Sequence, residues 1–208
     1  MLHDIIAVVA SAIISAISAM GYAGVALLMA IESACVPLPS EIIMPFAGYL
    51  VSKGELNLLG VATAGALGCN LGSALAYAIG ARGGRPAVER WGRYVLLSGH
   101  DIDLAERFFA RYGSITVFIC RLLPVVRTFI ALPAGIARMN LWRFHAYTFV
   151  GSWLWCYGLA YLGARLGAEW DSNPTVKALF HQADIVIVGL GLAGIGFLVW
   201  HRLRQRRA

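Results

Sequence analysis

The hydrophobic and polar positions of this chain divide it into six apolar stretches with polar segments between them. Three of these, 56–81, 141–166 and 178–200, are long enough to cross a bilayer as helices, which takes roughly 20 apolar residues. The first stretch, 5–19, is short and predicts either a tilted span or a helix lying in the membrane interface. The pattern is therefore typical of an all-α integral membrane protein.

The other two apolar stretches, 25–50 and 115–136, carry prolines and charges that a plain spanning helix does not hold. Proline removes a backbone donor and clashes with the preceding turn. Broken backbone at membrane depth persists only where protein or a water-filled cavity surrounds it. We therefore expect two re-entrant helical hairpins, with the residues that break them being Pro37, Pro39, Pro124, Gly48 and Gly135.

The two halves of the chain repeat one pattern. Each broken stretch ends in an Ala-Gly pair, at Gly48 and at Gly135, and a long apolar stretch follows it. The same offset of 83 residues separates Asn57 from Asn140 and Gly80 from Gly163. Equal offsets at both ends of a span favour an internal duplication over chance.

Basic residues predict how the repeats are oriented. Arginines gather in the segment 82–112 and in the tail 202–208, and the positive-inside rule places both in the cytoplasm. One span then separates the two hairpins, so they open to opposite faces, as in the inverted repeats of secondary transporters. Arg165 lies on the other side and counts against this topology.

The resulting fold class is an inverted-topology repeat with two opposed re-entrant hairpins plus transmembrane helices, in a single membrane domain, 1–208. We expect the following parts: an N-terminal tilted or interfacial helix, 1–20; repeat 1, 22–82; a cytoplasmic amphipathic connector, 83–112; repeat 2, 113–167; a C-terminal transmembrane helix, 176–201; and a basic tail, 202–208.

Composition excludes several other classes. The chain is 59% hydrophobic and 13% charged, which is too apolar for a soluble domain of this size. Its net charge of +6 comes from residues that flank apolar stretches, so we expect contact with anionic headgroups and no nucleic acid. The four cysteines lie singly in apolar runs and predict no disulfide framework, metal site or cofactor.

Four ionisable residues lie where lipid or protein core is expected: Glu32, Glu41, Arg121 and Arg127. A charge at the bilayer centre costs about 2.5 kcal/mol or more, so such residues usually serve a function. Arginine keeps its charge and presents a planar fork of donors, so Arg121 and Arg127 are candidates for binding a phosphate. Glu32 and Glu41 can take up and release protons as their exposure alternates. The alternative is structural, with the acids and bases neutralising each other to hold the hairpins together.

The same residues resemble a known family. The stretches ESACVPLPSE at 32–41 and RLLPVVR at 121–127, with Ala47-Gly48 and Ala134-Gly135, are similar to the DedA family, which shares the SNARE-associated Golgi domain. The likeness extends over about residues 22–165. The chain departs from a common family pattern at Ser73, where many members have aspartate, and at Ala81, where many have arginine.

The resemblance implies a bacterial inner-membrane protein with two opposed hairpins, whose membrane acids and arginines are Glu32, Glu41, Arg121 and Arg127. Family members are implicated in returning undecaprenyl phosphate from the outer to the inner leaflet, and are linked to proton-motive force. Others are linked to flipping phosphatidylethanolamine, and eukaryotic relatives scramble phospholipids.

We therefore expect a multi-pass flippase with a cytoplasmic C-terminus, which acts on a lipid phosphate and on protons and is not an enzyme. A homo-oligomer is compatible with the sequence. The alternatives are a phospholipid flippase or passive scramblase, and a structural or membrane-homeostasis factor.

Overall fold

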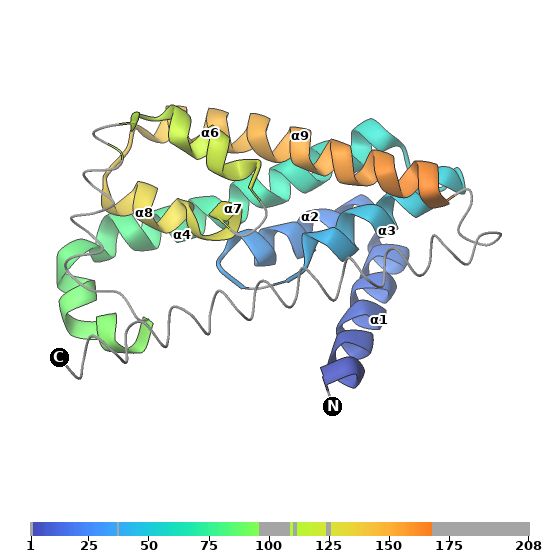
Figure 1. The fold of residues 1–208 in the computed structure, drawn as a ribbon, viewed down its shortest axis with the longest axis horizontal. Helices are drawn as coiled ribbons and strands as arrows, with labels where there is room; N and C mark the ends of the chain where they lie inside the picture. Colours follow the sequence, from blue (N-terminus) through green and yellow to red (C-terminus); the bar gives the residue numbers. More distant parts are fainter. Residues whose placement is uncertain (1, 37, 96–108, 110–111, 124–125, 168–208) are drawn as a thin grey trace.

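Every regular element in the described part of the chain is an α-helix (Figure 1). The computed structural model describes residues 2–36, 38–95, 109, 112–123 and 126–167. Its helices are α1 (Leu2–Met20), α2 (Tyr22–Ser33), α3 (Ser40–Ser52), α4 (Leu58–Val95), α6 (Ile115–Arg121), α7 (Val126–Phe129), α8 (Ala131–Ile136) and α9 (Leu141–Gly167). The predicted all-α class is confirmed for these residues. Pro37, Pro124, the C-terminal helix 176–201 and the tail 202–208 lie outside them.

Helices α4 and α9 run side by side in opposite directions. Asn70 of α4 donates to the carbonyl of His145 on α9, and Trp153 of α9 donates to Thr63, which lies earlier on α4. Each helix begins with an asparagine cap. The Asn57 side chain accepts from the backbone N–H of Leu59 at 2.9 Å, and Asn140 accepts from Arg143 at 3.2 Å. The two asparagines that mark the repeat therefore have one structural role, the satisfaction of free N–H groups at a helix start.

Helix α4 corrects one predicted boundary. It continues to Val95 and so includes the first part of the expected connector 83–112, whereas the sequence pattern placed its end near Ala81. Figure 1 shows its green last part bent away from the rest. The sequence there contains Pro86, which removes one backbone donor and bends a helix without ending it.

Two helical hairpins approach the α4–α9 pair from opposite ends. The first consists of α2 and α3, and it begins beside the start of α4, where the Asn57 N–H donates to the Tyr22 hydroxyl at 2.7 Å. The second consists of α6, α7 and α8, and α8 packs near Gly80, later on α4. The tips meet between them, with the Cys35 thiol 3.6 Å from the Thr128 carbonyl oxygen (Figure 1).

Glycines let α3 of the first hairpin pack closely on α9, and α8 of the second hairpin pack closely on α4. A Cβ built on Gly48 of α3 would lie 2.1 Å from the carbonyl oxygen of Ala160 on α9. A Cβ built on Gly135 of α8 would lie 2.2 Å from the carbonyl oxygen of Tyr77 on α4. These two contacts correspond, because Tyr77 and Ala160 are also 83 residues apart. Only glycine permits backbones to come this close.

This packing corrects the expectation that Gly48 and Gly135 break the hairpins. Both lie inside helices, α3 and α8, and act as contact points. Pro39 does lie in the connection between α2 and α3, directly before α3 begins.

The outer face of the bundle is apolar. Among the described residues, the segment Leu58–Gly83 of α4 is the one that is long and apolar enough to cross a bilayer. Four of its side chains at helical spacing are exposed: Leu67, Leu71, Leu75 and Ile79. A continuous exposed apolar stripe of this kind is typical of a surface that contacts lipid or another protein.

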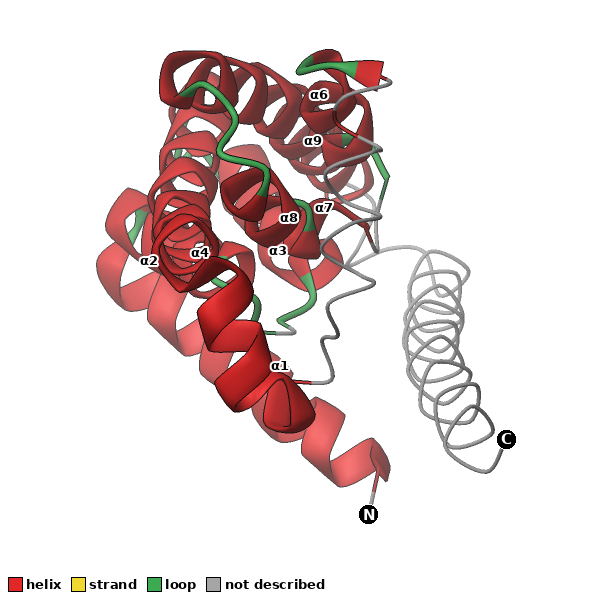
Figure 2. Ribbon diagram, turned by 90° about the vertical axis from the view of Figure 1, so that its left-hand side faces the viewer, coloured by secondary structure: helices red, strands yellow, loops and turns green. Residues whose placement is uncertain are grey.

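Helix α1 runs out of the bundle (Figures 1 and 2). Its second half is anchored through Ile13 and Ile17, which are buried with residues of α2 and α3. A second apolar core, around Phe144 and Val117, lies where α6 and α8 meet α4 and α9. The two cores flank the meeting point of the hairpin tips.

Candidate functional site

Glu32 and Arg127 form a buried ion pair between the two hairpins. Glu32 is in the last turn of α2, and Arg127 is in α7, just after the break in the second hairpin. The Arg127 Nη2 lies 3.1 Å from Glu32 Oε2, and the residues are 1% and 2% exposed. The sequence predicted all four membrane charges as one site, and the structure brings these two into contact.

Hydroxyl groups complete the surroundings of the Glu32 carboxylate. Thr128 donates to Oε1 at 2.8 Å, and Ser33 donates to Oε2 at 3.1 Å. Together with Arg127, they give the buried carboxylate three donors on two hairpins. A buried charge needs this degree of hydrogen bonding to offset its lost hydration.

Arg121 is fully buried and has no carboxylate partner in the part of the chain that the structure describes. It lies at the end of α6 with 0% exposure. Its Nη2 donates to the hydroxyl of Ser73 on α4 at 2.5 Å, and that hydroxyl donates to the carbonyl of Cys69. The Nε and Nη1 atoms of Arg121 have no partner among the described residues. A buried guanidinium without a counter-ion is a strong attractor for an anion.

Arg127 also keeps part of its donor capacity free. Its guanidinium lies 5.3 Å from the centre of the Trp155 ring on α9, and its Nη2 approaches the Cys69 sulfur at 3.5 Å. Its Nε and Nη1, like those of Arg121, lack a partner in the described residues. Both arginines thus retain unused N–H groups inside the bundle.

Glu41 has different surroundings from Glu32. It is in the first turn of α3 and half-buried, and it forms no ion pair with Arg121 or Arg127. Among these four residues, the structure therefore contains one formed ion pair, one acid without a contacting base, and one arginine without a contacting acid.

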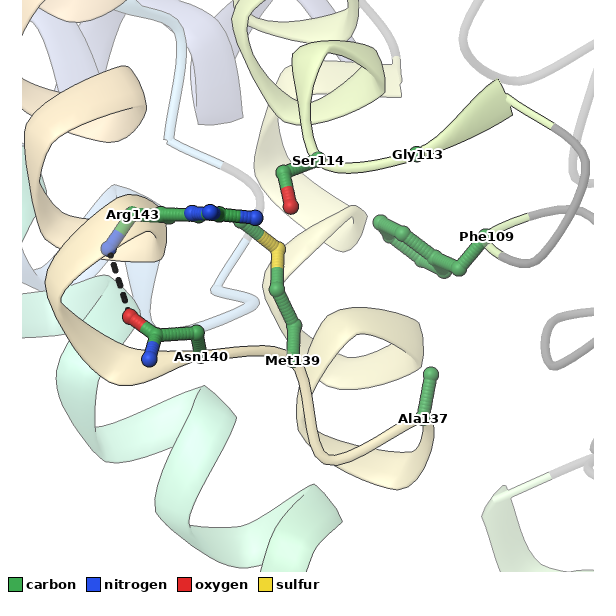
Figure 3. A pocket seen from close by; sticks show the side chains of 7 residues that line it. All are labelled: Phe109, Gly113, Ser114, Ala137, Met139, Asn140 and Arg143. Carbon is green, nitrogen blue, oxygen red and sulfur yellow. Dashed lines mark hydrogen bonds between the residues drawn. The ribbon is translucent and has the colours of Figure 1, made fainter.

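The buried group is closed to the exterior, and the open pocket in Figure 3 lies elsewhere. That pocket has a volume of about 330 Å³ and lies beside the start of α9. It contains none of the four predicted site residues, being lined by Phe109, Gly113, Ser114, Ala137, Met139, Asn140 and Arg143. Access to the buried charges requires the hairpins or helices to move.

Several contacting residues carried no signal in the sequence. Thr128, Ser33 and Trp155 are ordinary residues of apolar segments, and only the fold brings them to the charges. Ser73 was noticeable because it departs from a family pattern, and it proves to be the partner of Arg121. Within the described residues, no group of three His, Cys, Asp or Glu side chains is placed to hold a metal ion.

Comparison with known proteins places the chain in a family of membrane proteins. The family model described as the VTT domain matches residues 38–165, so the chain belongs to this family, which is the DedA and SNARE-associated Golgi family. The match begins inside the first hairpin and ends near the end of α9.

Relatives in bacteria match over most of their length. The uncharacterised membrane protein YkoX of Bacillus subtilis is 37% identical over 93% of this chain and 83% of its own. The undecaprenyl phosphate transporter A of the same organism is 36% identical over 92% of this chain and 94% of its own. A protein of Lactococcus lactis named alkaline phosphatase-like is 34% identical over 86% of each chain. No solved structure matches the chain.

Proposed function

We propose that this protein moves a lipid with a phosphate headgroup across the bacterial cytoplasmic membrane, with undecaprenyl phosphate as the first candidate. The observation that carries the proposal is Arg121, a fully buried guanidinium with free N–H groups and no carboxylate in contact. A phosphate supplies the missing negative charge and the missing acceptors. The relative named undecaprenyl phosphate transporter A supports the choice of lipid.

In this proposal the two hairpins are re-entrant and open to opposite faces of the membrane. Their approach from opposite ends of the α4–α9 pair supports an inverted repeat. The exposed apolar stripe on α4 supports a surface that contacts lipid. The chain then forms one multi-pass domain, whose parts are 1–20, 22–82, 83–112, 113–167, 176–201 and 202–208. The basic tail supports a cytoplasmic C-terminus.

Transport runs from the outer to the inner leaflet and is coupled to protons. Glu41 is the better candidate for the proton carrier, because Glu32 is held by Arg127, Thr128 and Ser33. Protonation of Glu41 removes one negative charge from the surroundings of Arg127 and so changes how strongly the site attracts an anion.

The test is transfer of undecaprenyl phosphate between leaflets of proteoliposomes, with and without a pH gradient. We expect the wild type to transfer the lipid faster under the gradient. Arg121→Gln should reduce the transfer rate by about a hundredfold, because the buried charge that receives the phosphate is lost. Glu41→Gln should still transfer the lipid but no longer respond to the gradient. Transfer by Arg121→Gln at the wild-type rate would refute the proposed site.

A passive scramblase of ordinary phospholipids is the first rival. It needs no proton, so both wild type and Glu41→Gln would ignore the gradient, and phosphatidylethanolamine would move as fast as the polyprenyl phosphate. The same proteoliposomes loaded with labelled phosphatidylethanolamine decide between the two.

A structural factor is the second rival, in which the Glu32–Arg127 pair only joins the hairpins. Exchanging the charges, as Glu32→Arg with Arg127→Glu, retains a pair and should preserve the function of a structural factor. A flippase should lose transport, because the exchange relocates the charges around the phosphate. The name of the Lactococcus relative makes a phosphatase assay worthwhile, and we expect the purified protein to release no phosphate from the lipid.

A further inference from the structure

The buried polar atoms without a partner gather in one place. In the described residues there are seven such side-chain atoms, and they belong to five residues: Arg121, Arg127, Thr148, Ser152 and Trp155. Guanidinium and indole nitrogens can only donate, and hydroxyls can donate or accept. The group therefore has more donors than acceptors, and its members cannot all satisfy one another.

Three of these residues lie on one face of α9. Thr148, Ser152 and Trp155 follow each other at spacings of four and three, which places them in a row along the helix. All three are in the middle of α9, at least six residues from either end. The row is therefore part of the rigid helix shared by both hairpins.

Both arginines lie against the same face. Gly151, adjacent to Ser152, is the point where Arg121 crosses α9, since a Cβ built on Gly151 would lie 2.7 Å from the Arg121 Cβ. The Trp155 ring lies 5.3 Å from the Arg127 guanidinium. A side chain larger than hydrogen at residue 151 would push Arg121 away from the row.

The two hydroxyls contrast with a third hydroxyl in the same region. Serine and threonine in helices commonly donate to the carbonyl four residues earlier. Ser73 does so, to the Cys69 carbonyl at 2.5 Å. Thr148 and Ser152 are buried in a helix as well, at 0% and 1% exposure, and make no such bond. Their donors are left available for an acceptor that the described residues do not supply.

We propose that this face of α9 is a ligand-binding surface, on which Thr148, Ser152 and Trp155 join the two arginines around the terminal oxygens of a phosphate monoester. The inference rests on the proposed function and adds to it the residues that select the headgroup. A monoester presents three terminal oxygens and up to two negative charges. A diester, as in ordinary phospholipids, presents two oxygens and one charge. The excess of donors therefore selects lipids that end in a monoester phosphate.

The test compares lipids that differ only in the headgroup. Dissociation constants are measured in detergent micelles by displacement of a fluorescent polyprenyl phosphate, with phosphatidic acid as the monoester and phosphatidylglycerol of the same acyl chains as the diester. We expect the wild type to bind phosphatidic acid about tenfold more tightly than phosphatidylglycerol. In Thr148→Val/Ser152→Ala, phosphatidic acid should bind about tenfold more weakly, and the preference should largely disappear.

A control variant separates the proposed role from a general loss of packing. Thr63→Val removes a hydroxyl from the exposed side of α4, where it accepts from Trp153, and should leave binding unchanged. If the double variant fails to fold, Ser152→Ala and Trp155→Phe make the same comparison singly.

The outcomes distinguish this inference from the function on which it rests. If the wild type binds phosphate lipids without a monoester preference, or the double variant keeps that preference, the α9 surface is refuted and the transport proposal stands. If the wild type binds no phosphate lipid at all, both are refuted. Displacement of the probe by inorganic phosphate at similar concentrations would retain the surface but refute a lipid headgroup as its ligand.

Discussion

Arg121 and Arg127 are six residues apart in the chain and have different surroundings in the fold. Arg127 is paired with Glu32 and lies over Trp155, so its charge is largely balanced. Among the described residues, Arg121 is bonded only to the Ser73 hydroxyl. Because a hydroxyl carries no charge, the positive charge of Arg121 remains available to a ligand.

The residue at position 73 therefore controls the anion affinity of Arg121. We expect Ser73→Asp to supply a buried carboxylate next to the guanidinium and to weaken binding of the polyprenyl phosphate by about tenfold or more. The thermal midpoint of unfolding should be unchanged or higher, because a charge that was unbalanced is now paired. Binding and unfolding measured on the same detergent preparation check both parts.

Ser73→Ala is the control for that experiment. It removes the hydroxyl without adding charge, so affinity for the lipid phosphate should stay within a few fold of wild type. Equal affinities for Ser73→Asp and Ser73→Ala would show that Arg121 does not bind the anion.

At the scale of helices, close glycine contacts hold α3 against α9 and α8 against α4. Gly163 of α9 is the partner of α3, since a Cβ there would lie 2.2 Å from the Pro45 carbonyl oxygen. Gly80 of α4 has the same position relative to α8, 2.4 Å from the Leu132 carbonyl oxygen. The two pairs of contacts are 83 residues apart in α4 and α9, which supports the proposed repeat.

We expect Gly163→Val to destabilise the protein by up to about 3 kcal/mol, because the neighbouring atoms are backbone and cannot turn aside. Gly158→Val is a matched control on the same helix, since a Cβ at Gly158 meets nothing within 4 Å. The free energy of unfolding, measured by denaturant titration in one detergent, should fall for Gly163→Val only. Equal effects for both variants would refute a specific contact between α3 and α9.

At the scale of the whole molecule, the site is closed because the hairpin tips meet over it. The contacts between the tips are Glu32 with Arg127, Glu32 with Thr128, and Cys35 with the Thr128 carbonyl. A lipid headgroup cannot reach Arg121 while they hold, so the proposed transport requires the tips to separate, as in transporters that alternate access.

Joining the tips covalently should stop transport. Thr128→Cys places a second thiol near Cys35, whose sulfur is 3.6 Å from the Thr128 carbonyl oxygen. Oxidation with copper phenanthroline should form the disulfide and lower lipid transfer by about tenfold or more, and reductant should restore it. Each sample is compared with itself reduced, which removes the effect of losing the Thr128 hydroxyl. Wild type treated with the oxidant is the control, and unimpaired transfer by the oxidised variant would exclude separation of the tips as a required step.

Much of the architecture could be predicted from pattern alone. The charges and prolines in 25–50 and 115–136 marked the broken segments, and the ends of α9 were predicted to within a residue. The paired asparagines and glycines predicted a duplication, because caps and close helix contacts require particular residue types at particular positions. The re-entrant placement in a membrane and the transport function remain proposals.

The partners of each charge depended on tertiary structure. Four charges in apolar segments indicate that a polar site exists, yet they do not indicate which acid meets which base. Glu32 contacts Arg127 across 95 positions of sequence, and Arg121 contacts Ser73 across 48. Likewise, Thr148, Ser152 and Trp155 looked like ordinary residues of a spanning helix until α9 was placed beside both arginines. The local pattern records what a segment can bury, whereas contacts between distant segments arise only when the hairpins pack against the long helices.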